Sequence, residues 1–309
     1  MLAVLGFRLG LALACLLFSS RAQAQAEIPD DTPATRVVML GTGTPNADPD
    51  RSGPAVAVVV RGRAYLVDCG PGVVRRAAAA ARNGIAALAP EKLGIVFVTH
   101  LHSDHTLGLP DLMLTPWVLE RRVPLEVYGP RGIKAMTRHL LEAYAEDIRI
   151  RQEGLEPDKH EGYQANAHEI VEGVVYRDTN VTVTAFEVPH ANWPHAFGYR
   201  FETRDRVVVI SGDTRPSEKT IAMCDGCDVL VHEVYSADRF VERPLEWQRY
   251  HTDAHTSTTD LAALATRAAP KLLVLYHQLF WGASDDDLVR EVKRGYAGEV
   301  VSGKDLEVY

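Results

Sequence analysis

The sequence has 309 residues, of which 46% are hydrophobic, and this supports one large domain or two small ones. Its 33 Lys and Arg residues against 41 Asp and Glu residues give a formal net charge of −8. An acidic chain repels polyphosphate backbones unless it carries a local basic patch, and no run of Lys or Arg is long enough to form one. The composition therefore argues against nucleic acid as a partner.

The first 26 residues have the composition of a secretory signal peptide. Arg8 precedes an apolar core at 9–18, and Ala22-Gln23-Ala24 and Ala24-Gln25-Ala26 are small-residue cleavage sites. The apolar core is too short to span a membrane comfortably. We therefore expect residues 1–26 to be removed and residues 27–309 to be an exported chain, periplasmic or secreted, with no membrane span.

Apolar runs bounded by turn residues predict strands throughout the rest of the chain. The expected strands lie at 36–40, 55–60, 64–67, 96–98, 125–128, 174–176, 181–186, 197–202, 207–210, 229–231 and 272–276, with one or two more within 299–308. Helices are expected at 73–82, 107–119, 133–145, 257–268 and 285–294, and residues 146–170 are expected to be irregular. Because no dinucleotide fingerprint is present, two sheets with outer helices and one doubly wound sheet fit this alternation equally well.

Cysteine usage leaves two interpretations open. Cys69 follows an apolar strand and is expected to be a small buried residue. Cys224 and Cys227 have C-x-x-C spacing, which in an exported protein is compatible with a local disulfide or with two free thiols. A zinc site at this pair would need two further ligands, and the neighbouring sequence offers none.

One short stretch carries most of the chemical information. The apolar run at 96–98 is followed by His100, His102, Asp104 and His105. On a strand end, His100 and His102 project to the same side because they are two residues apart. Neutral imidazole suits zinc, and a carboxylate can complete or bridge such a site. The stretch predicts a metal site, and the alternative is a polar loop that happens to contain histidines.

Ligand-type residues recur where other apolar strands end. Strand ends on one rim are where α/β scaffolds assemble their sites, and a purely structural protein has no reason to repeat the pattern. The residues that follow this pattern are Asp68, His100, His102, His190, Asp213, His232, Glu233 and His277. We therefore expect them to meet in space.

The H-x-H-x-D-H sequence at 100–105 resembles the signature of the metallo-β-lactamase superfamily. Within it, Gly41-Thr42-Gly43, His232-Glu233 and His255-Thr256-Ser257 resemble the ribonuclease Z and arylsulfatase-like branch. The resemblance covers essentially all of residues 27–309 and implies one hydrolase domain. The implied fold is α/β, a four-layer αβ/βα sandwich of two mixed β-sheets with outer helices.

The resemblance also implies two zinc ions per chain. Carried over residue by residue, it assigns one ion to His100, His102 and His190, the other to Asp104, His105 and His277, and a bridging position to Asp213. His195 competes with His190 for its place, but the preceding Val188-Pro189 favours His190. Asp68 is expected either to accept a hydrogen bond from a ligand histidine or to be a simple turn residue.

The implied catalytic residues are Asp104, Glu233 and His255. Two divalent ions about 3.5–4 Å apart can share a hydroxide, which supplies a nucleophile at neutral pH. The leaving group still needs a proton, and the resemblance gives this role to His255, held by Glu233. A carboxylate partner would favour the protonated imidazole that a general acid requires. The alternative is an ordinary buried His–Glu contact.

Other histidines and tryptophans receive weaker assignments. His232 is expected to be a structural partner rather than a ligand. A substrate cleft could be lined by Trp117, Trp193, Trp247 and Trp281, of which Trp193 and Trp281 are favoured because each lies close to a ligand in the sequence. Surface or loop positions are expected for His139, His160, His168 and His251.

Three functions remain open from the sequence. The first is a zinc hydrolase of phosphodiesters or sulfate esters, the second an exported β-lactamase-like lactam hydrolase, and the third a non-catalytic zinc-binding protein, which the complete ligand set disfavours. The expected partner is a small-molecule ester or lactam, and a homodimer is compatible with the sequence. Transfer RNA is disfavoured, because residues 140–180 lack the long glycine- and proline-rich arm that some ribonucleases Z use to grip it.

Overall fold

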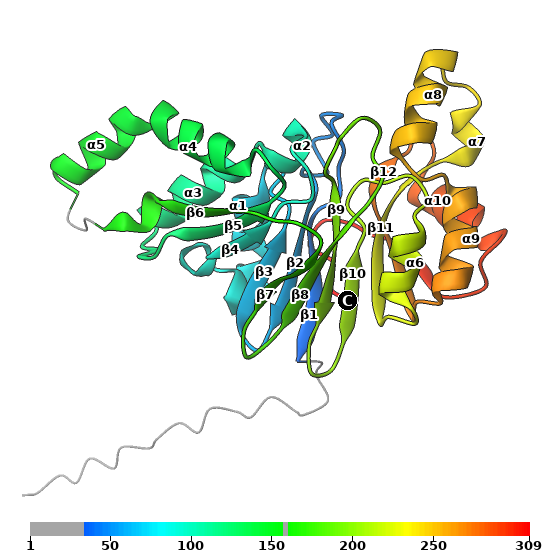
Figure 1. Ribbon diagram of the computed structural model, residues 1–309, viewed down its shortest axis with the longest axis horizontal. Coiled ribbons are helices and arrows are strands. Elements are labelled where there is room, and N and C mark those ends of the chain that lie inside the picture. Colours follow the sequence, from blue (N-terminus) through cyan, green and yellow to red (C-terminus); the bar gives the residue numbers. More distant parts are fainter. Residues whose placement is uncertain (1–33, 157–159) are drawn as a thin grey trace, which may run out of the picture. The chain divides into compact units, whose positions relative to one another are not determined.

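The computed structural model describes residues 34–156 and 160–309. The segment expected to be a signal peptide lies outside these residues, so export stays a prediction. In the part of the chain that is described, no helix has the length and apolar character needed to cross a membrane. Two mixed β-sheets form the centre of the described chain, with helices on their outer faces (Figure 1).

The first sheet has six described strands in the order β1-β2-β3-β4-β5-β6. β1 to β3 pair antiparallel, whereas β3 to β6 pair parallel. The strands are β1 (Thr35–Gly41), β2 (Ala55–Val60), β3 (Arg63–Val67), β4 (Ile95–Phe97), β5 (Leu125–Gly129) and β6 (Ala165–Glu169).

The second sheet repeats this plan with seven described strands in the order β13-β12-β11-β10-β9-β8-β7. β10 to β13 pair parallel, and β7 to β10 pair antiparallel. The strands are β7 (Gly173–Arg177), β8 (Thr182–Glu187), β9 (Phe197–Glu202), β10 (Val207–Ile210), β11 (Val229–Tyr235), β12 (Leu272–Leu279) and β13 (Val300–Ser302).

α-Helices cover the outer faces of the two sheets. They are α1 (Val73–Arg82), α2 (Ser103–Thr106), α3 (Leu109–Val118), α4 (Ile133–Ala143), α5 (Ala145–Glu153), α6 (Glu218–Cys224), α7 (Ala237–Phe240), α8 (Leu245–Ala254), α9 (Thr258–Ala268) and α10 (Asp285–Lys293). Short 3₁₀ turns are η1 (Ala86–Leu88), η2 (Pro90–Lys92) and η3 (Glu161–Tyr163).

The strands consist of continuous runs of apolar residues because both faces of each sheet are buried. Along β1, Val37 and Met39 face the core between the sheets, while Val38 and Leu40 face the core beneath α1 and α3. A third core packs β10 to β12 against α6, α9 and α10. The layers are therefore helix, sheet, sheet and helix, and the expected four-layer sandwich of two mixed sheets is confirmed.

Several local expectations need correction. The span 146–170 is not irregular, since it contains most of α5 together with η3 and β6. The helix expected at 107–119 is present as α3, but the preceding residues, expected to be a turn, form the short helix α2. Helices α6, α7 and α8 were not predicted, because α6 and α7 have only 7 and 4 residues and α8 is mainly polar, so all three depend on tertiary contacts.

The structure shows which of these cysteines are bonded to each other. Cys69 is buried with a free thiol, as expected. Cys224, the last residue of α6, forms a disulfide with Cys227, which decides between the two open interpretations. The disulfide closes the turn that leads from α6 toward β11.

Contacts between the sheets hold the histidine-rich loop that follows β4. The Phe197 backbone N–H donates to the Thr99 carbonyl at 2.9 Å, and the buried Tyr199 hydroxyl donates to the Val98 carbonyl at 2.7 Å. Both donors belong to β9 in the second sheet. The loop that starts at the end of β4 is therefore fixed from both sheets, and the functional residues lie where it ends.

Candidate metal centre

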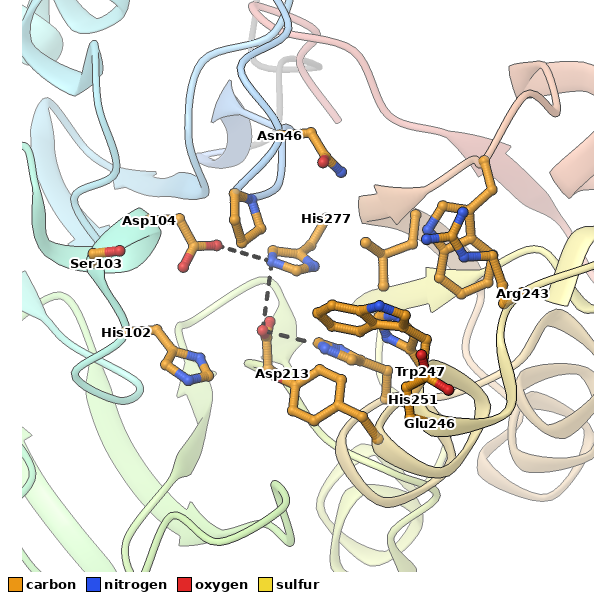
Figure 2. Close-up of a pocket in the computed structure, with 15 residues that line it drawn as sticks. Asn46, His102, Ser103, Asp104, Asp213, Arg243, Glu246, Trp247, His251 and His277 are labelled. Carbon is orange, nitrogen blue, oxygen red and sulfur yellow. Dashed lines mark hydrogen bonds and ion pairs between the residues drawn. The ribbon is translucent and has the colours of Figure 1, made fainter.

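Most of the residues predicted to meet lie together at one end of the sandwich, but His232 belongs to neither ligand group and its Nδ1 donates to the Glu233 carbonyl instead. His100 and His102 follow β4, and α2 then carries Asp104 and His105. His190 follows β8 and Asp213 follows β10, as the strand-end pattern predicts. Figure 2 shows Asp104, Asp213 and His277 around one space, joined by dashed contacts.

His277 reaches this space in an unexpected way. It lies inside β12 rather than after it, as His232 and Glu233 lie inside β11. In the pairing of these strands, Glu233 faces Tyr276 and Val234 faces Gln278, so His277 is the extra residue of a β-bulge. Its φ of 44° is in the left-handed region, and such bulges re-aim a side chain. The bulge directs the imidazole toward the carboxylates.

Three histidines form the first group. His102 Nδ1 lies 2.9 Å from His100 Nε2 and 3.3 Å from His190 Nε2. Asp213 Oδ2 is 3.9 Å from His100 Nε2. These four side chains place one ligand atom each within 4.8 Å of the others, so they could hold one cation.

Asp104, His105 and His277 form the second group, which meets the same criterion. Asp104 Oδ2 is 3.2 Å from His277 Nε2 and 3.5 Å from His105 Nε2. Asp213 also faces this group, because its Oδ1 is 3.4 Å from His105 Nε2 and its Oδ2 is 3.4 Å from His277 Nε2. Asp213 thus lies between the two groups, in the position predicted for a bridging carboxylate.

Hydrogen bonds behind the imidazoles fix which nitrogen is free. Asp68 Oδ2 accepts from His105 Nδ1 at 2.8 Å, so in the neutral form of His105 the lone pair is on Nε2. The Thr99 hydroxyl donates to Asp68 and therefore accepts from His100 Nδ1 at 3.0 Å, which leaves His100 Nε2 free. Asp68 is therefore an acceptor behind the histidines, the first of its two predicted roles.

His190 and His102 are oriented by different partners. His190 Nδ1 donates to the Ala254 carbonyl at 2.7 Å, so its Nε2 faces the first group as an acceptor. The Trp193 indole N–H donates to His102 Nε2 at 2.7 Å. This contact places the His102 proton on Nδ1, so a cation bound through Nδ1 requires the Trp193 hydrogen bond to open. The competing His195 is exposed and contacts Glu187, and it does not reach the group.

Burial keeps the first group neutral. Removal from water lowers the pKa of His100 well below its usual range, and it lowers the pKa values of His102 and His190 to about 4. Neutral imidazoles keep the lone pairs that a metal ligand needs. The first group is therefore uncharged at neutral pH, and it can accept a cation once the Trp193 hydrogen bond to His102 opens.

The second group is organised by charge. Burial alone would lower the pKa values of His105 and His277, but the Asp213 carboxylate raises both above their usual range. Burial also opposes ionisation of Asp213, yet His277 and His105 hold its pKa well below the usual range. An ionised carboxylate in this setting requires a positive partner, which is either imidazolium or a cation in its place.

Unpartnered atoms show that a cation fits. Among the described residues, His105 Nε2 and Asp213 Oδ1 are buried side-chain atoms without a hydrogen-bond partner. Buried polar groups are rarely left unpaired, and both atoms face the space between the two groups. Imidazole nitrogens with carboxylate oxygens are the donor set that zinc accepts.

Glu233 and His255 are neighbours, as predicted, but their pKa shifts differ from the predicted ones. His255 Nδ1 is 3.4 Å from Glu233 Oε1 and 4.0 Å from Asp213 Oδ2. Burial lowers the pKa of His255 to about 4, and burial together with the Asp213 charge raises the pKa of Glu233 well above its usual range. This differs from the expectation that an ionised Glu233 holds a protonated His255, because desolvation outweighs the pairing.

A cavity of about 660 Å³ opens above these residues (Figure 2). Trp281 lines it, as predicted, whereas Trp193 contacts His102 instead. His251 is not a surface histidine, since it lies on α8 in the cavity wall and is only 6% exposed. Trp247 on the same helix also lines the cavity, although the sequence favoured Trp193 over it, and Tyr250 was missed.

The sequence and the fold match known proteins. A family model described as a β-lactamase superfamily domain matches residues 63–278. A ribonuclease Z of Mycobacterium sp. strain KMS is 38% identical over 247 residues, which cover 79% of this chain and 84% of the relative. The structure of human short-form tRNase Z has 23% identity, covers 89% of this chain and 98% of its own, and has a TM-score of 0.66.

A further solved structure confirms the fold alone. A metallo-β-lactamase-fold protein of Bacillus subtilis has a TM-score of 0.69 at 19% identity, and it covers 89% of this chain and 99% of its own. The named relatives correct one expectation. Nucleic acid was excluded as a partner from composition, but the relatives are ribonucleases, and their substrate class is RNA. The exclusion is wrong because net charge averages the whole surface, whereas binding depends on local groups.

The hydrogen bonds of Asp68 predict its effect on metal affinity. The two carboxylate oxygens of Asp68 accept hydrogen bonds from Thr99 and His105. Asp68→Asn keeps the shape of the side chain but leaves only one acceptor oxygen. We expect zinc affinity to fall about 10- to 100-fold, since losses of this size follow removal of a carboxylate behind a ligand histidine. Competition with a chelator measures it. Asp111→Asn on α3 serves as the control, and an unchanged affinity in Asp68→Asn would contradict the assigned role.

Proposed function

The chain belongs to the metallo-β-lactamase superfamily, in its ribonuclease Z branch, and on that premise we propose that it is a binuclear zinc-dependent phosphodiesterase that cleaves RNA. One observation carries the proposal, namely the position of Asp213 between two groups of ligand-type side chains. The sequence also leaves sulfate esters and lactams open as substrates. No feature of the site favours either of them over a phosphodiester.

The proposed ligands follow the geometry. One ion would be held by His100, His102 and His190, the other by Asp104, His105 and His277, and Asp213 is placed to serve both. Two such ions lower the pKa of water toward about 7 and stabilise charge that develops on phosphoryl oxygen. Asp68 and the Ala254 carbonyl keep the ligand nitrogens turned inward.

Glu233 and His255 are proposed to supply the proton for the leaving oxygen. Backbone N–H groups of Thr214 and Thr256 hold Glu233 Oε1 at 3.2 and 3.0 Å, so the carboxyl group cannot swing away. Its raised pKa and the lowered pKa of His255 allow the buried pair to retain one proton at neutral pH. His255 lines the cavity, and it is therefore the member of the pair that can pass the proton to substrate.

Positive groups that are scattered in the sequence gather beside the centre. Arg215 and Arg249 line a second cavity of about 400 Å³, which shares Tyr250 with the main cavity. Arg243 lines the main cavity itself. Arginine is well suited to phosphate contacts, and these three side chains give an otherwise acidic chain a local site for an RNA backbone.

The substrate class is tested by a panel of hydrolysis assays. Purified protein with zinc is expected to cleave a short RNA, and Asp213→Ala is expected to abolish most of that activity because both ions lose a ligand. Sulfate esters and a β-lactam are included as competing substrates. Faster turnover of either of these than of RNA would overturn the proposed substrate, and near-wild-type activity in Asp213→Ala would overturn the shared ligand.

His255 is tested through the leaving group. His255→Ala is expected to lower turnover of an unactivated phosphodiester about 10²- to 10⁴-fold, because an alkoxide needs a proton to depart. The loss should shrink for a p-nitrophenyl ester, whose leaving group departs unprotonated. Glu233→Gln should give a smaller loss of the same pattern. Equal losses for both esters would rule out proton donation, and reduced zinc content in His255→Ala would place His255 among the ligands.

A further inference from the structure

Four aromatic rings form one wall of the main cavity. We call this set the aromatic wall, and it consists of Trp247, Tyr250, His251 and Trp281. The rings are in contact with one another, since the His251 ring centroid lies 4.7 Å from that of Trp281 and 5.7 Å from that of Trp247. Helix α8 supplies three of the rings, and Trp281 follows β12. Figure 2 shows Trp247 and His251 on the same side of the cavity as Arg243, opposite His102 and Asp104.

Packing of the protein does not account for the two exposed rings of the wall, Trp247 and Tyr250. Trp247 is 48% exposed and Tyr250 is 37% exposed, although both border a buried cluster of ionisable residues. On α8 only His251 and Ala254 are buried. A tryptophan half in water next to a catalytic centre leaves a flat apolar face available to a ligand.

The wall continues directly from the proton donor of the proposed mechanism. The His255 ring centroid lies 5.5 Å from that of His251 and 6.0 Å from that of Tyr250. An oxygen that takes its proton from His255 must be within hydrogen-bond reach of that ring. The atoms attached to this oxygen on the leaving side therefore enter the space that the aromatic wall borders.

The chemistry of the wall selects the kind of group that enters. Every nucleobase has a π-face that stacks on aromatic side chains, and this stacking is sequence-tolerant. The Arg243 guanidinium carbon lies 5.3 Å from the Trp281 ring centroid, so a cation also borders the aromatic surface. An aliphatic leaving group would gain far less from the exposed Trp247 and Tyr250 rings than a heteroaromatic base would.

We propose that the aromatic wall is a base-binding subsite that stacks the nucleobase of the leaving nucleoside, the product that departs without the phosphate. The inference rests on the proposed phosphodiesterase function and adds to it a substrate requirement. The enzyme should depend on a base on one side of the scissile phosphate and much less on the other side.

Three dinucleoside monophosphates test the requirement. The first is adenylyl-adenosine, and the other two each lack one of its two bases. Product analysis of the first identifies which nucleoside leaves without phosphate. Loss of the leaving-side base is expected to lower kcat/KM of the wild type about 5- to 100-fold, the range expected for one base stacked on aromatic side chains. Loss of the other base should change it about 2-fold or less.

Variants of Trp247 separate stacking from general burial. Trp247→Leu should reproduce the loss on adenylyl-adenosine and cause no further loss on the substrate that already lacks the leaving-side base. Trp247→Phe should retain most of the wild-type rate because a ring remains. Tyr144→Ala, which removes an exposed ring in a separate cavity bordered by α3 and α5, is the matched control and should leave all three rates unchanged.

A binding measurement checks the subsite without turnover. Adenosine should bind the metal-free wild type and Trp247→Phe, and it should bind Trp247→Leu at least several-fold more weakly, as followed by calorimetry. Equal rates for the three dinucleotides, or a Trp247→Leu loss that is the same for all of them, would overturn the base-binding subsite. Failure of the wild type to cleave any of them would instead overturn the proposed phosphodiesterase function.

Discussion

The buried carboxylate of Asp213 is the constraint on which the site depends. It is 2% exposed, and it faces His100, His105 and His277 at ion-pair distances. Burying a carboxylate is costly unless positive charge is close, so the fold must deliver cations or imidazolium to this point. Asp213 Oδ1 and His105 Nε2 have no hydrogen-bond partner, and two metal ions that share Asp213 would bind these atoms.

The two-sheet scaffold is what brings these groups to one place. His100 and Asp104 come from the loop and helix after β4 in the first sheet, whereas Asp213 and His277 come from β10 and β12 in the second. Hydrogen bonds from β9 to Val98 and Thr99 tie the loop of the first sheet to the second. Because both faces of each sheet are packed in apolar cores, the ends of the strands are held rigidly enough to position ligand atoms.

Much of this could be predicted from the sequence because the signals were local. The H-x-H-x-D-H stretch and the strand-end positions of His190 and Asp213 identified the ligand cluster, and the resemblance supplied its division into two groups. The His277 bulge was not predictable, since it arises from the register between β11 and β12. Helix α8 and the gathering of Arg215 and Arg249 were also hidden, because tertiary contacts bring together residues whose local sequence reads as polar surface.

Anomalous diffraction from zinc-loaded crystals tests most directly whether two metal ions share Asp213. Two anomalous peaks are expected about 3.5–4 Å apart, one beside the His100 group and one beside the His105 group, with the Asp213 carboxylate between them. A single peak, or two peaks of which only one lies within bonding distance of Asp213, would contradict the sharing of Asp213.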